Sequence, residues 1–445
     1  MAEYSGYGKS STFTMLYWLP EDESTPYQLN IQDVQIAIAN SLGTAGSRAF
    51  EIIRRISLED DWQVYLVGGP VRDVLLGKDI NDLDFGVAGD AFVLSSIIAL
   101  ELGGEVINHP QFLTASVIAQ DIRIDIATSR KESYPSHGLL PQVAPGSIFD
   151  DLSRRDFSIN AMAFPLWQEQ PQLLDPHDGL IDLNARLIRV LHSDSFNDDP
   201  TRMFRAVKYE SRFGFRITSD SLSTMLSALT NGVMARVSGE RIIQEIDRIF
   251  LEPKVLEIIA RSRELGLMKA IQKSWMTSPF PFEGFEELKL RIHDDPMSCL
   301  VAICWDLGYS KGELLINRLN MPKVWSDLVR DTASLRSIES ELSSENILPS
   351  EIYSLLESIA DTVIKTGAIL TENQVFESRL SFFTDTLMGT SPILNGDDLI
   401  VLGIPEGPLI GDILKLLKDR KLDREIITEL DERNFVKSFL KSSLG

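Results

Sequence analysis

The spacing of hydrophobic residues changes twice along the chain. Residues 31–58 repeat apolar side chains at helical spacing, and short apolar runs then alternate with helical segments. The expected strands are 64–67, 83–87, 106–107, 116–119 and 122–127, and the expected helices between them are 71–76 and 91–102. From Pro200 onward helical periodicity dominates. The pattern predicts an α+β protein, in which a mixed sheet with packed helices precedes an all-α remainder.

The length of the chain requires more than one domain. With 445 residues, of which 44% are hydrophobic and 24% charged, the chain is globular and too long for a single ordinary core. A polar segment at about 337–350 marks a further boundary within the helical part. We expect an N-terminal extension and four domains, with the boundaries 1–30, 31–193, 194–250, 251–345 and 346–445.

Composition limits the possible locations of the protein. No apolar stretch is long enough to span a bilayer, so we expect a cytoplasmic protein that does not associate with membranes. Cys299 and Cys304 stand in an apolar helical stretch without the spacing of metal ligands. They are expected to be buried and to form no disulfide, which fits a reducing compartment.

A diglycine follows the first expected strand directly. The apolar run 64–67 delivers Gly68 and Gly69 to a turn where the backbone can approach a ligand closely. The next segment has a helical pattern that places Arg72 in its first turn. Free amides at this helix start, together with the Arg72 guanidinium, are suited to hold a triphosphate.

Three aspartates on expected strands form a candidate metal site. Asp82 and Asp84 are two residues apart in a strand pattern, so both carboxylates leave the same face. Oxygen ligands of this kind suit Mg²⁺. Asp125 alternates with isoleucines in the run 122–126 and could complete a site for two magnesium ions from a neighbouring strand. The alternative for Asp125 is a surface position on an edge strand.

The segment from Gly68 to Asp84 resembles the head of the polymerase-beta-type nucleotidyltransferases. The similarity is to the branch shared by bacterial class II CCA-adding enzymes and poly(A) polymerases. Residues 152–163, Leu-Ser-Arg-Arg-Asp-Phe-Ser-Ile-Asn-Ala-Met-Ala, are similar to the Arg-Arg-Asp-Phe-Thr-Ile-Asn-Ala block of this family. The resemblance implies nucleotide contacts by four residues of the block: Arg154 and Arg155 with phosphates, and Asp156 and Asn160 with a ribose hydroxyl.

A second similar block begins the helical part. Asp199 and Pro200 read as the N-cap and first position of a helix. The family has Glu-Asp-x-x-Arg here, which implies that Asp199 and Arg202 contact the base edges of cytosine and adenine in place of a template.

Basic residues then recur at intervals of three and four. On a helix they would form a single cationic stripe for RNA, although the net charge of the chain is −22. The alternative is a solvated face with internal ion pairs. The expected RNA-binding residues are Arg205, Lys208, Arg212 and Arg216.

Two further blocks extend the resemblance, which covers about residues 62–417. Residues 238–241, Ser-Gly-Glu-Arg, resemble a block that opens a helix supporting the base-reading helix, and Glu240 and Arg241 are expected to be structural. The glycine-rich stretch 396–411 resembles the tail of CCA-adding enzymes, which engages the tRNA body. By this resemblance the expected domains are a nucleotidyltransferase head, a base-recognising neck, a body and a tail.

The resemblance implies a template-independent tRNA nucleotidyltransferase that adds CCA from CTP and ATP with two Mg²⁺ ions. A loop at 131–150 looks complete, and the family needs this loop for A addition, so full CCA synthesis is favoured over CC-only or A-only addition. The acidic composition and the glycine-rich tail disfavour a poly(A) polymerase. A catalytically silent RNA-binding protein is the remaining alternative, which the intact residues Asp82, Asp84, Arg155, Asp199 and Arg202 disfavour.

Overall fold

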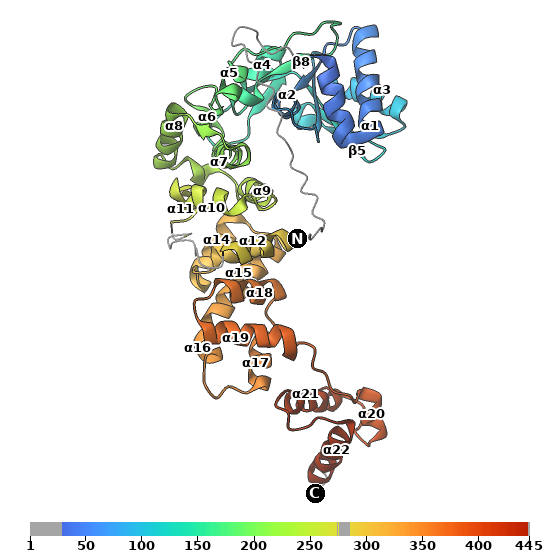
Figure 1. Cartoon of the computed structure of the whole chain (residues 1–445), viewed down its shortest axis with the longest axis vertical. Helices are drawn as coiled ribbons and strands as arrows, with labels where there is room; N and C mark the ends of the chain where they lie inside the picture. The colour runs from blue at the N-terminus through green and yellow to red at the C-terminus, as the bar shows by residue number, and fades with distance from the viewer. Residues whose placement is uncertain (1–28, 274, 276–284, 444–445) are drawn as a thin grey trace, which may run out of the picture. The chain divides into compact units, whose positions relative to one another are not determined.

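A six-stranded mixed sheet lies at the centre of the N-terminal part of the computed structural model (Figure 1). The strand order is β3 (Glu105–His109), β4 (Thr114–Ala119), β5 (Ile122–Thr128), β2 (Leu83–Val87), β1 (Val64–Val67) and β8 (Ala163–Pro165). β2 and β5 are parallel, while the other neighbouring pairs are antiparallel. The mixed sheet expected from the sequence is therefore confirmed.

The structure describes residues 29–273, 275 and 285–443, so the expected N-terminal extension lies almost wholly outside the described residues. The chain divides into two compact units. The first, called the head, runs to residue 195 without 136–139. The second, called the helical unit, contains 136–139 and 196–445. The finer division into neck, body and tail stays a prediction.

Helices accompany the sheet where helical periodicity predicted them. α1 (Ile31–Glu59) is capped by Asn30, whose side chain accepts from the Asp33 amide, and it bends at Gly43. It buries an apolar face that includes Phe50 and Ile53. α3 (Ala91–Leu102) is capped by Asp90 and packs against β4. The head also contains α2 (Gly69–Leu75), α5 (Gly179–Asn184) and β9 (Leu187–Ile188).

Residues 131–150, expected as a loop, contain a hairpin. β6 (Arg130–Ser133) pairs with β7 (Gln142–Pro145), and α4 (Ile148–Ser153) follows, capped by Ser147. The prolines and glycines that suggested a loop lie mostly at the tip, where they permit the turn. Ile148 and Leu152 of α4 are buried in a cluster with Tyr65 and Val67 of β1, so the segment after α4 is held close to the end of β1.

The helical unit contains α7 (Arg202–Phe213), preceded by α6 (Ser195–Asp198) at the boundary with the head and followed by β10 (Arg216–Ile217), α8 (Ser219–Thr230) and α9 (Gly239–Phe250). Its later helices include α10 (Val255–Glu264), α11 (Leu267–Ile271), α12 (Phe285–Asp294), α13 (Ser298–Cys304), α14 (Tyr309–Leu319), α15 (Lys323–Ser337), α16 (Glu339–Leu342), α17 (Pro349–Leu356), α18 (Asp361–Leu370) and α19 (Gln374–Phe382). Cys299 and Cys304 lie buried in α13, as the sequence predicted. None of the helices in the described ranges is long and apolar enough to cross a membrane.

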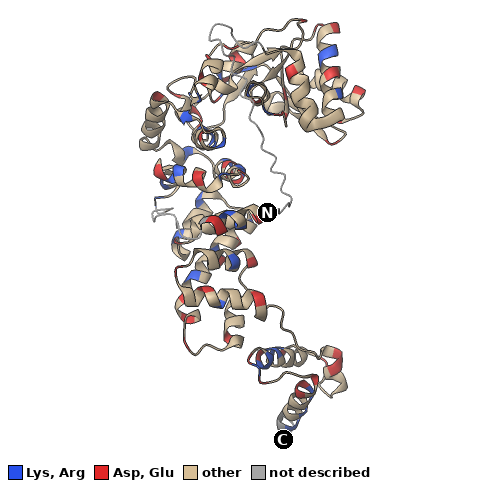
Figure 2. Ribbon diagram, viewed as in Figure 1, with Lys and Arg blue, Asp and Glu red and all other residues tan. Residues whose placement is uncertain are grey.

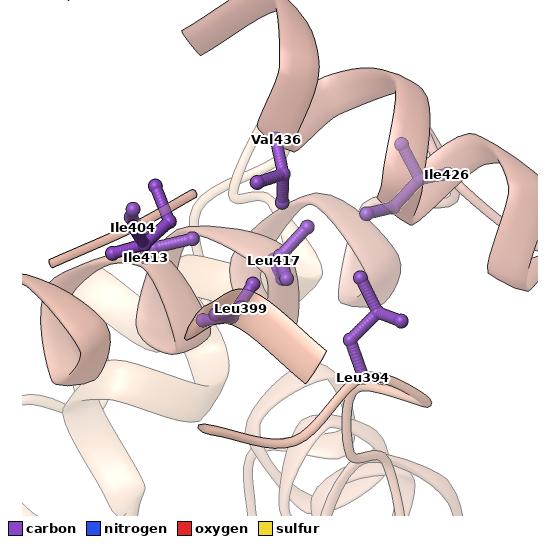
Figure 3. Packing of buried hydrophobic residues seen from close by; sticks show 7 residues of the cluster. All are labelled: Leu394, Leu399, Ile404, Ile413, Leu417, Ile426 and Val436. Atoms are coloured by element: carbon purple, nitrogen blue, oxygen red, sulfur yellow. The ribbon is translucent and has the colours of Figure 1, made fainter. Parts of the chain in front are cut away.

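The last three helices pack around a small apolar core (Figure 3). α20 (Gly396–Val401), α21 (Pro408–Leu422) and α22 (Glu429–Ser443) enclose this tail core, whose members are Leu394, Leu399, Ile404, Ile413, Leu417, Ile426 and Val436. Gly396 and Pro408 are each the first residue of a helix, so the glycine-rich stretch contains two helix starts. Glu432 is fully buried beside this core.

Candidate active site

Two aspartates stand side by side on parallel strands of the head. Asp84 of β2 is in register with Asp125 of β5, so both side chains leave the same face of the sheet. Leu83 and Phe85 point to the other face and are buried. Asp82 precedes β2 by one residue and is exposed. The expected placement of Asp125 beside Asp84 is confirmed, while its role in catalysis stays a prediction.

The carboxylates repel one another. Burial, followed by the charges of Asp125 and Asp82, raises the pKa of Asp84 to about 6, although Arg155 and Arg123 oppose the shift. A carboxylate whose ionised form is disfavoured in this way gains much from a nearby cation. Mg²⁺ prefers oxygen ligands such as these carboxylates, and it would add positive charge where the aspartates repel one another.

The third carboxylate is engaged with protein groups. The Arg123 Nε–H donates to both Asp125 oxygens, at 2.9 and 3.1 Å, and the Ser116 hydroxyl donates to Asp125 Oδ1. Arg123 Nη2 also donates to Ser116 Oγ at 3.0 Å. Within the described ranges, no three acidic, histidine or cysteine side chains are gathered as a ready-made metal site.

The turn after β1 requires glycine. Gly68 has a φ of 72°, and its amide donates to the Met162 carbonyl at 3.1 Å. A Cβ at Gly68 would lie 2.3 Å from Arg155 Nη1, so a side chain would displace the guanidinium. Because Leu66 pairs with Phe85, the turn emerges next to Asp84. The structure thus places the turn, Arg155 and the carboxylates in one region of the head.

Arg72 is buried and holds the block that follows α4. Its Nη1 donates to Asn160 Oδ1 at 2.6 Å, and its Nε and Nη2 donate to Asp73, both at 2.9 Å. Asn160 in turn donates to Asp156 Oδ1 at 3.0 Å. Asp156 and Asn160 are both buried, so these residues form a rigid support. The expected direct phosphate contact of Arg72 stays a prediction.

An ion network fixes Arg154 and Arg155. Asp151 accepts from Arg154 at 2.7 and 3.0 Å and from Arg155 at 3.1 Å. Burial opposes ionisation of Asp151, but Arg155 and Arg154 outweigh it and hold the pKa of Asp151 below its usual range. Glu132 of the hairpin accepts from Arg154 at 2.9 Å and from Arg130 at 3.2 Å.

Sequence reasoning missed the acidic members of this network and both partners of Asp125. Arg130 and Glu132 alternate on one face of β6, a signal hidden by the expectation of a loop. Ser116 pairs with Asp125 across two strands, which no local pattern reveals.

The helical unit holds the second set of expected nucleotide-binding residues. Asp199 Oδ1 accepts from Arg241 Nη2 at 2.7 Å, and Arg241 Nη1 donates to the Gly138 carbonyl at 3.1 Å. Arg202 is buried in the first turn of α7. α9, which starts at Gly239 and is capped by Ser238, packs against α7. The helix-opening role expected for residues 238–241 is confirmed.

The start of α7 differs from the prediction. Asp199 is not its N-cap, because the helix begins at Arg202 with Thr201 at the capping position. Asp199 instead accepts from the Thr201 amide at 3.0 Å and from the Thr201 hydroxyl at 2.7 Å, a turn in which an aspartate binds the backbone two residues on. Pro200 therefore lies in this turn and not in the helix.

The single cationic stripe is not what the structure contains. α7 ends at Gly214, whose φ is 67°, so Arg216 lies in β10 and not on the helix. Lys208 is buried, and burial lowers the pKa of its ammonium group. Arg212 is exposed but pairs with buried Glu252, with Nε at 2.9 Å from Oε2. Acidic and basic residues are interspersed along the helices of this unit (Figure 2).

Comparison with known proteins gives consistent similarities. The model of the poly A polymerase head domain matches residues 64–189. The chain is 31% identical over 382 residues to an A-adding tRNA nucleotidyltransferase of Halalkalibacterium halodurans, covering 84% of this chain and 88% of that protein. It is 30% identical over 406 residues to a protein of the same description from Geobacter sulfurreducens, covering 85% of this chain but only 45% of that protein. The solved structure of a Thermotoga maritima CCA-adding enzyme complexed with tRNA aligns with a TM-score of 0.74 and 27% identity over 94% of this chain and 100% of that one.

Proposed function

Because the chain belongs to the family of class II CCA-adding enzymes and bacterial poly(A) polymerases, we propose that it completes the 3′ end of tRNA. The substrates are tRNA, CTP and ATP, and the product is the CCA end with release of pyrophosphate. The observation that carries the proposal is the register of Asp84 with Asp125 beside the Gly68 turn, against which the Arg155 guanidinium lies.

The residues of the head divide the work of nucleotidyl transfer. The terminal 3′ hydroxyl of tRNA attacks the α-phosphorus, a new P–O bond forms, and the bond to pyrophosphate breaks as the hydroxyl proton is lost. Arg155 lies against the Gly68 turn, where its charge can neutralise the phosphates. Arg72 and Asp151 keep Asn160 and Arg155 in place.

Asp82, Asp84 and Asp125 would hold the magnesium ions. Bound there, Mg²⁺ would lower the pKa of the attacking hydroxyl and neutralise the leaving pyrophosphate. The raised pKa of Asp84 supports this assignment, since burial and the charges of Asp125 and Asp82 outweigh the opposing charges of Arg155 and Arg123 in the protein alone.

Base selection is assigned to the helical unit. Asp199 supplies acceptors and Arg202 donors, which together match the Watson–Crick edges of cytosine and adenine. Arg241 donates to Asp199 and so fixes the direction of its carboxylate. Asp156 and Asn160 are the candidates for contact with the ribose hydroxyl.

Addition of the terminal A alone is the second candidate. The proteins from Halalkalibacterium halodurans and Geobacter sulfurreducens, each similar over more than four fifths of this chain, are both A-adding tRNA nucleotidyltransferases. The ordered hairpin β6–β7 is compatible with both candidates, because the family needs this segment for A addition.

One assay separates the candidates. Purified protein with Mg²⁺ is given two tRNAs, one lacking CCA and one lacking only the terminal A, with labelled CTP, ATP or both. We expect two C and one A on the first tRNA and one A on the second.

Extension of the second tRNA only would support A-only addition, and a stop after CC on the first would support CC addition. Long A tracts would identify a poly(A) polymerase. No incorporation by folded protein with saturating Mg²⁺ would contradict every enzymatic assignment.

A further inference from the structure

The third carboxylate of the head is held by two neighbours that the proposed chemistry does not use. Arg123, two residues before Asp125 on β5, donates one N–H to both Asp125 oxygens. Ser116, directly opposite on β4, donates its hydroxyl to Asp125 and accepts from Arg123. We call these two side chains the Arg123–Ser116 clamp. Through it the carboxylate is engaged on both oxygens.

The geometry of the clamp makes it displaceable. A single Arg123 N–H is shared between the two Asp125 oxygens, whereas a strong arginine–carboxylate pair uses two parallel N–H groups. The side chains of Arg123 and Asp125 are 61% and 41% exposed, so solvent screens the attraction between them. Ser116 is only 2% exposed and contributes a second hold that carries no charge.

A metal ion shared by the three aspartates needs the same Asp125 oxygens. Asp125 Oδ1 already accepts two hydrogen bonds, from Ser116 and Arg123, which occupy both of its lone pairs, so the clamp and a cation compete for this oxygen. We propose that the Arg123–Ser116 clamp is a positioning device that holds Asp125 in the metal-free enzyme and is opened by the ion that binds Asp82 and Asp84. The proposal rests on the proposed function, since it takes the three aspartates as metal ligands.

The clamp also explains how three carboxylates can share one face before a cation arrives. Asp84 already has a neighbour of like charge in register. The positive charge of Arg123, which is paired with Asp125, reduces the repulsion between Asp84 and Asp125 in the free enzyme. With an ion held by the aspartates, this contribution of Arg123 would no longer be required.

Metal affinity of the protein without tRNA or nucleotide tests the proposal. Free Mn²⁺ is measured by its electron paramagnetic resonance signal during titration of wild type, Arg123→Gln, Ser116→Ala and the control Arg55→Gln. Arg55 is an exposed arginine of the same unit that pairs with Glu59 and Glu101. We expect Arg123→Gln to bind Mn²⁺ about two- to fivefold more tightly and Ser116→Ala about twofold, with no change for Arg55→Gln.

Ser116→Ala separates the clamp from a general charge effect, because it alters no charge. A clamp predicts tighter binding in this variant, whereas unchanged or weaker binding would overturn the proposal. A double-mutant cycle adds a second criterion. In an Asp125→Asn background, Arg123→Gln should no longer tighten Mn²⁺ binding, and a persistent gain would show that Arg123 acts through charge alone.

Failure of the inference is distinct from failure of the proposed function. Wild-type protein that binds Mn²⁺ and extends tRNA, with no effect of either clamp variant on affinity, refutes the clamp and leaves the function standing. Wild-type protein that neither binds Mn²⁺ nor extends tRNA refutes both.

Discussion

Asp84, a proposed metal ligand, has a carboxylate that is partly buried beside two like charges. Its pKa of about 6 lies above the usual value of 3.8, so the folded protein without metal binds a proton more tightly than the unfolded chain. Below about pH 4 both states are protonated and the shift has no effect on stability. As the pH rises from 4 to 6 the folded state loses stability, and the full loss applies at neutral pH.

Asp84→Asn should therefore stabilise the metal-free protein while abolishing nucleotide transfer. In EDTA at pH 7.5 we expect a gain of about 1–3 kcal/mol in the free energy of unfolding, which vanishes as the pH falls to 4. Thermal unfolding of both proteins across this pH range measures the difference in the free energy of unfolding. Saturating Mg²⁺ should reverse the order, because only the wild type gains the free energy of metal binding.

The exposed turn residue Asp121 supplies the control. Asp121→Asn keeps a residue type that tolerates the left-handed conformation at this position, where φ is 64°, and it should leave stability and activity near wild type. A melting temperature of Asp84→Asn equal to wild type in EDTA at neutral pH would show that the Asp84 carboxylate is not destabilising.

At the residue scale the sequence predicted what local alternation can show. Alternation in the strand pattern predicted that Asp84 and Asp125 leave the same face, which their register confirms, whereas Asp82 lies just before β2 and its shared face stays a prediction. Ser116 could not be found, because its pairing with Asp125 depends on strand register. The burial of Arg72 could not be predicted from the sequence either, because it involves contact with Asn160, which is 88 residues away in the chain.

At the scale of elements, Glu432 joins α22 to the segment before α20. Its buried carboxylate accepts from the Ile393 amide at 2.9 Å, from the Leu394 amide at 2.8 Å and from Lys421 Nζ at 3.1 Å. A buried carboxylate with three donors is well compensated, but removal leaves those donors without an acceptor. Glu432 therefore fastens the segment that enters the tail core shown in Figure 3.

Glu432→Ala should loosen the three tail helices. We expect a loss of about 3 kcal/mol in local stability, read as faster hydrogen exchange of amides in α20–α22 with little change in the head sheet. Glu429→Ala, which removes an exposed partner of Arg433, is the matched control and should change exchange hardly at all. Equal protection in Glu432→Ala and wild type would contradict the fastening role.

Strands and helices were predictable where apolar runs were long. β1, β2 and α3 have the predicted bounds, because β1 is a buried apolar run, β2 alternates around Asp84 and α3 buries one apolar face. β8 escaped detection since its three residues become a strand by pairing with β1, about 100 residues earlier in the chain. The hairpin β6–β7 was missed because charged residues in β6 are buried by ion pairing and not by apolar packing.

At the scale of the whole molecule, the proposed tRNA substrate would have to bind to a chain with a net charge of −22. Phosphate binding then depends on individual basic residues that are not neutralised by acidic neighbours. Arg212 faces Glu252, whereas Arg216 lies exposed in β10, outside the helix. The two arginines of the expected stripe should thus behave differently.

Salt dependence of tRNA affinity distinguishes them. Arg216→Gln should reduce the slope of log K against log salt by about 1, as expected for one lost phosphate contact. Arg212→Gln should leave the slope almost unchanged, because its charge is already compensated by Glu252. An equal change of this slope in both variants would contradict the difference expected between Arg212 and Arg216. Circular dichroism checks that each variant is folded.

The division into units was only partly visible in the sequence. The loss of strand signals near Pro200 indicated where the helical part begins. The assignment of Ser136–Leu139 to the helical unit was not visible, because it depends on contacts such as Arg241 with Gly138.

The burial of both thiols has a practical consequence for studying motion. Burial raises the pKa of Cys304 to about 12 and raises that of Cys299 as well, so at pH 7 only roughly one Cys304 in 100,000 is the reactive thiolate. These are the only cysteines of the chain. A fluorescent maleimide would therefore react little with the two native cysteines and would label a cysteine introduced at an exposed position. Two such substitutions, Glu51→Cys in the head and Lys437→Cys in the tail, would let energy transfer between dyes follow the two units during the proposed nucleotide additions.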